Sequence, residues 1–103
     1  MGFLDGQVAV VTGGNRGIGR GIVEALAREG ATVALTARSR EAAATAAREV
    51  GGRTIGYGCD VRSYDAVREL FGEVARAAGG LDVLVNNAGI GIFSPVADRS
   101  PDD

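Results

Sequence analysis

A glycine-rich turn between an apolar run and a helical segment constrains this chain more than any other feature. The turn covers residues 12–19 and reads Thr-Gly-Gly-Asn-Arg-Gly-Ile-Gly. An apolar run at 8–11 precedes it, and a segment with helical spacing follows at 20–27. Glycines let a backbone come close to a pyrophosphate, and the free N–H groups at a helix start stabilise its charge. This context predicts a dinucleotide-binding site.

Two other interpretations of the same turn are weaker. A glycine-rich stretch taken alone can be an ordinary tight turn, because glycine adopts the backbone angles that turns need. The phosphate loop of nucleoside triphosphatases is excluded, because no Gly-Lys-Ser/Thr follows and the chain contains no lysine.

The remainder of the chain alternates strand and helix patterns without a repeat or an internal linker. Strands are expected at 7–12, 32–37, 54–59 and 81–85, and the third is the weakest because Gly56 and Gly58 interrupt it. Helices are expected at 17–28, 39–50 and 63–78, with Ser39 and Ser63 as caps and glycines at the ends. This alternation predicts a doubly wound α/β fold with about four parallel strands and three helices.

Size and composition indicate a small globular protein. The chain has 103 residues, of which 46% are hydrophobic and 23% are charged, and its net charge is −2. This charge gives no general attraction to nucleic acid or to a membrane surface. The apolar runs are strand length, the first residues lack a signal-peptide pattern, and Cys59 is the only cysteine. We expect one cytoplasmic domain, residues 1–103, with neither nucleic acid nor a membrane as partner.

Two residue types that enzymes often use are missing. The chain has no histidine, and all eleven of its basic residues are arginine. Arginine is almost never deprotonated in proteins, so it serves poorly as a general base or in a Schiff base. With one cysteine and no histidine, we expect no metal site.

The end of the sequence has two interpretations. Ser100, Pro101, Asp102 and Asp103 form the pattern of a helix start, with a capping serine, an N-terminal proline and acids in the first turn. The segment can be a polar, frayed terminus. It can also be the point at which a further βα unit would begin.

Three motifs in the expected order resemble the signatures of the short-chain dehydrogenase/reductase family. Residues 12–19 resemble its Thr-Gly-x-x-x-Gly-x-Gly motif, and residues 86–89, which read Asn-Asn-Ala-Gly, resemble its second signature. Asp60 and Val61, after the third expected strand, are similar to its adenine-contacting pair. The resemblance covers essentially the whole chain, but only the N-terminal, cofactor-binding half of a family member. The expected Rossmann-type fold is therefore truncated relative to one.

The resemblance also implies roles for individual residues. The backbone at Ile18 and the turn around Asn15 and Gly17 would hold the pyrophosphate, and the Asp60 carboxylate would accept from the adenine amino group. Asn87 and its two successors would flank the ribose, while Asn86 would brace the central strands. The full candidate set is Gly13, Asn15, Arg16, Gly17, Ile18, Gly19, Arg38, Ser39, Asp60, Val61, Asn87, Ala88 and Gly89. Taken alone, Asp60 could be a capping or turn residue at a strand end, and Asn86 and Asn87 could be a turn pair.

Charge at the end of the second strand predicts NADP(H) rather than NAD(H). NAD-preferring relatives have an acid there that binds the ribose 2′-hydroxyl, whereas this chain has Ala37 followed by Arg38. Arg38 could bind a 2′-phosphate with two hydrogen bonds, helped by Arg16 and by the Ser39 hydroxyl. One such contact contributes about 1.5–3 kcal/mol, or roughly ten- to over a hundredfold in affinity. Alternatively, Arg38 is merely solvated.

The sequence offers no catalytic residue. The family transfers hydride with a Tyr-x-x-x-Lys pair and a serine, in which a nearby cation lowers the tyrosine pKa. Tyr57 is followed at that spacing by Val61, and Tyr64 by Arg68, and both precede the second signature. We therefore expect no activity from this chain alone. A small carbonyl or alcohol substrate would bind only if the C-terminal half were supplied.

A half-fold of this kind would leave the strand at 81–85 on the edge of the sheet. Its apolar residues would favour pairing with a second copy or with a complementing chain. An alternative function is therefore a non-enzymatic module in which NADP(H) controls association. A third, a methyltransferase-like Rossmann fold, would typically need an acid where Ala37 and Arg38 stand.

Overall fold

Strands and helices alternate along the chain as the sequence pattern predicts. The computed structural model describes residues 2–87, so the helix start expected at 100–103 lies outside the described residues. The described strands are β1 (Val8–Val11), β2 (Thr32–Ala37), β3 (Thr54–Gly58) and β4 (Val83–Val85). The described helices are α1 (Gly17–Arg28), α2 (Arg40–Val50) and α3 (Tyr64–Ala78).

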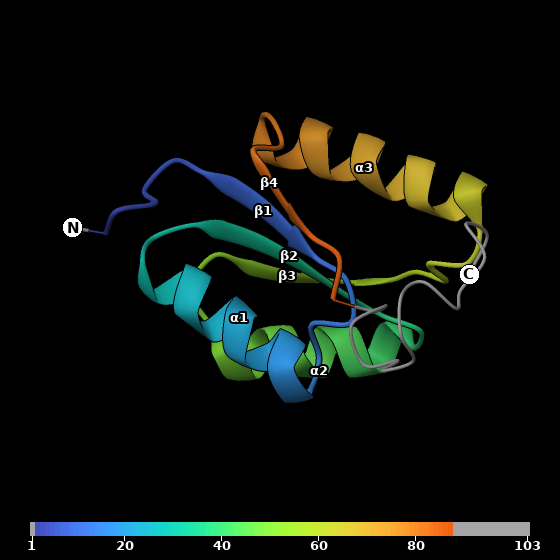
Figure 1. Cartoon of the computed structure of the whole chain (residues 1–103), viewed down its shortest axis with the longest axis horizontal. Coiled ribbons are helices and arrows are strands. Elements are labelled where there is room, and N and C mark those ends of the chain that lie inside the picture. The colour runs from blue at the N-terminus through green and yellow to red at the C-terminus, as the bar shows by residue number, and fades with distance from the viewer. Residues whose placement is uncertain (1, 88–103) are drawn as a thin grey trace, which may run out of the picture.

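These strands form one parallel sheet in the order β3-β2-β1-β4. The chain moves outward from β1 through β2 to β3 and then returns to the other side of β1. Helices α1 and α2 lie on one face of the sheet, and α3 lies on the other (Figure 1). The predicted doubly wound, Rossmann-type α/β fold is therefore confirmed.

Serine caps and glycines set the bounds of the helices. The Oγ atoms of Ser39 and Ser63 accept hydrogen bonds from the backbone N–H groups of Ala42 and Ala66, each at 3.2 Å. Gly79 ends α3 in the left-handed conformation that glycine adopts without strain. Between residues 2 and 87, no helix is both long and apolar enough to cross a bilayer.

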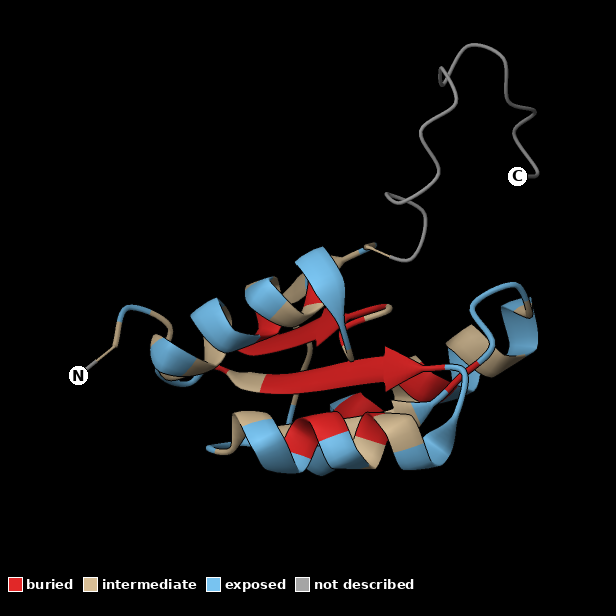
Figure 2. Cartoon of the chain, turned by 90° about the horizontal axis from the view of Figure 1, so that it is seen from below, coloured by how far each residue is buried: buried red, intermediate tan, exposed pale blue. Residues whose placement is uncertain are grey.

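The central strands β1 and β2 are buried on both faces, which explains their continuous apolar runs. Val11 and Leu35 pack with Val23 and Ala43 on the face that α1 and α2 cover, and both are fully buried. Val10 and Ala34 belong to the opposite cluster, with Leu70 and Val74 of α3. Neighbouring strand residues thus point to opposite faces, and both find a helix there. Figure 2 shows the buried residues gathered on the strands and on the inner sides of the helices.

The glycines of β3 reflect close helix packing rather than a weak strand. β3 pairs with β2 along its whole length, from Thr54 to Gly58. A Cβ atom at Gly56 would overlap the backbone of Ala43 in α2. Glycine is therefore required here because the helix backbone crosses the strand at this residue.

β4 is the edge strand of the described sheet, and it is shorter than expected. It begins at Val83, directly after Asp82, which binds Val8 twice: the Asp82 N–H donates to the Val8 carbonyl oxygen, and Asp82 Oδ2 accepts from the Val8 N–H, each at 2.8 Å. Leu84 pairs with Val10 and so points to the same face as α3, yet its side chain is 50% exposed. The helix α3 therefore leaves the β4 side of this face uncovered.

The burial difference between two leucines gives a test of the fold. Truncation of the fully buried side chain by Leu35→Ala should lower the free energy of unfolding by about 2–5 kcal/mol. The same truncation at the half-exposed residue, Leu84→Ala, should cost less than about 1 kcal/mol. Urea unfolding followed by circular dichroism measures both. Equal losses would contradict the described packing.

Candidate nucleotide-binding site

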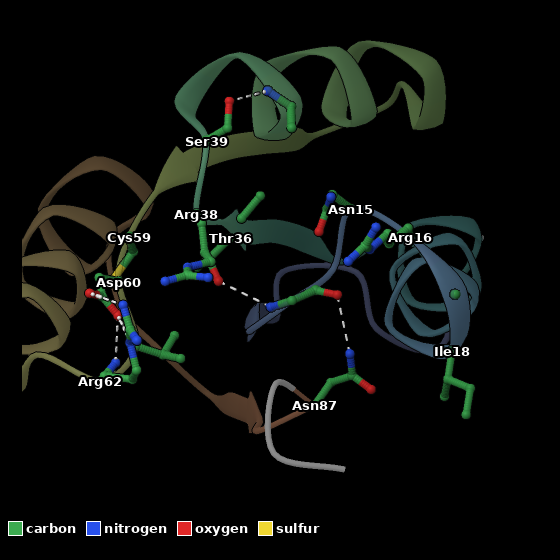
Figure 3. A pocket seen from close by; sticks show the side chains of 15 residues that line it. Asn15, Arg16, Ile18, Thr36, Arg38, Ser39, Cys59, Asp60, Arg62 and Asn87 are labelled. Atoms are coloured by element: carbon green, nitrogen blue, oxygen red, sulfur yellow. Dashed lines mark hydrogen bonds and ion pairs between the residues drawn. The ribbon is translucent and has the colours of Figure 1, made fainter. Parts of the chain in front are cut away.

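A pocket of about 780 Å³ opens at the carboxyl ends of the strands. It lies beside β1, where the strand order reverses: β2 and β3 are added on one side of β1, and β4 on the other. This is the usual ligand site of open parallel sheets. Figure 3 shows that its side chains come from the segments that follow all of the described strands. The lining consists of residues 13 and 15–18 after β1, 36–39 and 42 around the start of α2, 59–62 after β3, and 87 after β4.

The glycine-rich turn is held from both sides by hydrogen bonds. The Gly13 N–H donates to Thr36 Oγ1 at 3.1 Å, and the Gly14 N–H donates to the Thr36 carbonyl oxygen at 3.0 Å. On the other side, Asn87 Nδ2 donates to the Gly13 carbonyl oxygen at 3.1 Å (Figure 3). Gly13 and Gly17 have φ angles of 66° and 63°, in the left-handed region. These contacts fix the course of the backbone from β1 into α1.

The N-terminus of α1 is suited to bind an anion. Its N-cap residue, Arg16, makes no side-chain capping bond, and the first turn contains no acid. By contrast, α2 and α3 have serine caps and the acids Glu41 and Asp65 in their first turns. No capping side chain therefore accepts from the first N–H groups of α1, and a phosphate placed there would accept from them.

Three arginines line this pocket, of which the sequence analysis identified two. Arg16 and Arg38 are exposed, and neither forms an ion pair with another residue between 2 and 87. Ser39 uses its Oγ as an acceptor to cap α2, so that bond does not occupy its O–H donor. The third arginine, Arg62, was not among the candidates. Its position two residues after Asp60 was the available signal, because that spacing lets it reach back to the acid.

Asp60 and Arg62 form a tight ion pair at the end of β3. Arg62 Nε and Nη2 donate to Oδ1 and Oδ2 of Asp60 at 3.0 and 3.1 Å, and the Arg62 backbone N–H also donates to Oδ1. These hydrogen bonds, together with the charge of Arg38, lower the pKa of the Asp60 carboxyl to about 2. Of about four acceptor positions on a carboxylate, one remains on Oδ2. An amino group can donate to it.

Three more candidate side chains line the pocket. Those of Ile18 and Val61 are exposed, and that of Asn15 belongs to the glycine-rich turn. Gly19 is buried and does not line the pocket. A Cβ atom at this residue would overlap the Asn87 side chain and the Gly13 carbonyl oxygen. Gly19 therefore permits close packing of α1 against the end of β4. Ala88 and Gly89 lie outside the described residues.

The described tyrosines and the cysteine are not poised for proton transfer. Burial, with a smaller effect from Glu73, raises the pKa of Tyr57, which packs against the α3 face of the sheet. Tyr64 is 78% exposed on α3. Burial, together with Asp60, raises the pKa of the Cys59 thiol, which keeps it protonated. Between residues 2 and 87 there is no cluster of acids or cysteine able to bind a metal ion.

Comparison with known proteins gives a consistent family match. The family model for short chain dehydrogenases matches residues 7–103. The chain is 42% identical to a 3beta-hydroxysteroid dehydrogenase of Mediterraneibacter gnavus over 106 aligned positions, which cover 100% of this chain and 38% of the relative.

Two solved structures extend the likeness to three dimensions. A metagenomic short-chain oxidoreductase in complex with NADP is 45% identical with a TM-score of 0.79, covering 95% of this chain and 46% of that one. The RhlG/NADP active-site complex of Pseudomonas aeruginosa is 38% identical with a TM-score of 0.76, covering 82% and 35%. The chain thus spans less than half the length of the relatives it matches.

Two glycines of α1 provide a matched test of the site. Gly19→Ala places a methyl group against Asn87 and Gly13, and should lower the free energy of unfolding by about 1–3 kcal/mol. Gly21→Ala, in the same helix, meets no atom within 4 Å and should stabilise by up to about 1 kcal/mol through helix propensity. Urea unfolding measures both changes. A Gly19→Ala variant as stable as Gly21→Ala would refute the close packing.

Proposed function

This chain belongs to the short-chain dehydrogenase family, and we propose that residues 1–103 form the NADP(H)-binding part of a dehydrogenase or reductase. The observation that carries this proposal is an uncapped α1 N-terminus in one pocket with Arg16 and Arg38, neither of which forms an ion pair with a residue that the structure describes. The first supplies donors for a pyrophosphate, and the second supplies charge for a 2′-phosphate. The NADP complexes of two similar proteins support this reading.

Each part of the pocket would then bind one part of the cofactor. The backbone of Gly13, Asn15, Gly17 and Ile18 would hold the pyrophosphate, and Gly19 would keep α1 close to the turn. The open position on Asp60 Oδ2 would accept from the adenine amino group, with Val61 against the ring. Asn87, followed by Ala88 and Gly89, would flank the ribose. Bound NADPH would supply a hydride to a carbonyl substrate, and bound NADP+ would accept one from an alcohol.

The preference for NADP(H) rests on charge at the end of β2. Ala37 leaves no carboxylate to repel a 2′-phosphate, and Arg38 follows directly, exposed at the pocket. A guanidinium can donate two parallel hydrogen bonds to a phosphate, with Ser39 as a further donor. We also place the protein in the cytoplasm, where the single thiol of Cys59 would stay reduced.

A substitution at Arg38 tests the cofactor assignment directly. Arg38→Ala should weaken NADPH binding by roughly ten- to a hundredfold and leave NADH binding nearly unchanged, because only the 2′-phosphate loses a partner. Arg40→Ala, which removes an exposed arginine outside the pocket lining, is the matched control. Titration of cofactor fluorescence at fixed ionic strength measures all affinities. Equal losses for both cofactors would count against the assignment.

These 103 residues contain no Tyr-x-x-x-Lys pair for proton transfer. Neither Tyr57 nor Tyr64 has a lysine four residues on, and the chain contains no lysine at all. The family's tyrosine depends on the lysine at this spacing, whose charge lowers the tyrosine pKa so that it can exchange a proton with a carbonyl oxygen. The proton-transfer machinery would therefore come from a C-terminal segment that pairs along the open edge of β4, beside the exposed Leu84.

Turnover measurements separate this enzyme proposal from its alternative. We expect the 103-residue chain to oxidise no NADPH with simple ketones, and a co-expressed C-terminal half of a relative to restore turnover. The alternative is a non-enzymatic module in which NADP(H) controls association through β4. Under it, added C-terminal chain would restore nothing, while NADPH would change the oligomeric state in sedimentation. Sustained turnover by the chain alone would overturn both.

A further inference from the structure

The ion pair at the end of β3 lies beside the cation proposed to bind the 2′-phosphate. Asp60 and Arg62 are joined by two side-chain hydrogen bonds and one backbone bond, although their side chains are 48% and 72% exposed. Arg38 lines the same pocket from the end of β2, with its guanidinium directed toward Asp60 (Figure 3). Its charge contributes to the low pKa of the Asp60 carboxyl, so the two side chains interact through space.

Asp60 thus stands between two arginines but bonds to one of them. No ion pair joins Arg38 to Asp60, whereas Arg62 occupies both carboxylate oxygens. Arginine binds a carboxylate with the same forked geometry that it uses for a phosphate. A carboxylate that paired with Arg38 would therefore compete with the 2′-phosphate for the same donors and would also repel its charge.

We propose that Arg62 is a positioning residue for cofactor choice: by holding the Asp60 carboxylate in a bidentate ion pair, it leaves the Arg38 guanidinium available for the 2′-phosphate. This inference rests on the proposed function and deepens it. Arg62 acts through Asp60 and Arg38, and touches neither the 2′-phosphate nor the reacting atoms. The Asp60 carboxylate can then accept from the adenine amino group, and the Arg38 guanidinium can still donate to the 2′-phosphate.

Two small ligands isolate the effect of the 2′-phosphate. Adenosine 2′,5′-bisphosphate and adenosine 5′-monophosphate share the adenine and the 5′-phosphate, so the ratio of their affinities reports the 2′-phosphate alone. Calorimetric titration of the full chain measures this ratio. Arg62→Ala should reduce the ratio by about threefold to fivefold, the size expected for an exposed charge pair. Arg68→Ala, an exposed arginine on α3 outside this pocket, should leave it unchanged.

A double variant distinguishes positioning from direct binding. In Asp60→Asn/Arg62→Ala no carboxylate remains to engage Arg38, so the ratio should return to the wild-type value. The lost adenine contact affects both ligands equally and cancels. A double variant whose ratio stays low would mean that Arg62 itself binds the 2′-phosphate, which overturns the proposal. An unchanged ratio in Arg62→Ala overturns it too.

The ligand-free chain provides a second readout. Carboxyl NMR titration of Arg62→Ala should show a raised pKa for Asp60 that stays below its ordinary value of 3.8, because Arg38 becomes its partner. Adding Arg38→Ala should then raise it further toward the ordinary value, while the backbone N–H of residue 62 still donates to Oδ1, and the absence of a further rise would contradict the proposal. If the wild-type chain binds both adenosine ligands equally, the proposed NADP(H) function fails. If it prefers the bisphosphate and Arg62→Ala preserves that preference, only the role of Arg62 fails.

Discussion

The rest of the site depends on two hydrogen bonds that join Gly13 to the end of β2 and to the residue that follows β4. Thr36 at the end of β2 binds the Gly13 N–H, and Asn87 after β4 binds the Gly13 carbonyl oxygen. Because these anchors lie on opposite sides of β1, they fix the direction in which the chain enters α1. That direction brings the uncapped N-terminus of α1 to the pocket, where its N–H groups can meet a phosphate.

The three arginines that line this pocket differ in their ion pairing. Arg16 and Arg38 are exposed and form no ion pair within residues 2–87, which suits them to bind a ligand's phosphates. Arg62 donates to both carboxylate oxygens of Asp60, and its positive charge offsets that of the carboxylate at this end of the pocket. The pocket can therefore offer an acceptor to an adenine and donors to a phosphate at neighbouring positions, which neither charge alone would allow.

Most of the fold could be predicted from the sequence, because its signals are local. Apolar runs marked the strands, Ser39 and Ser63 marked helix starts, and these caps are present in the structure. The interpretation of β3 as a weak strand rested on Gly56 and Gly58 without the helix that packs on them. Gly56 is required because of the backbone of Ala43, thirteen residues earlier in the chain, and no local pattern reports that contact.

By itself, the sequence determined the alternation of strands and helices, the position of the glycine turn and the absence of an acid at Ala37, because each depends on neighbouring residues. Only the tertiary structure decided that Asp60 pairs with Arg62 and not with Arg38, and that Gly19 lies against Asn87. It also decided that Leu84 is left half-exposed on the sheet edge. The Asp60–Arg62 pair joins residues only two apart, but the distance from Arg38 to Asp60, the Gly19–Asn87 contact and the exposure of Leu84 depend on segments far apart in the chain. Their relative positions are set only when the sheet assembles and its helices pack.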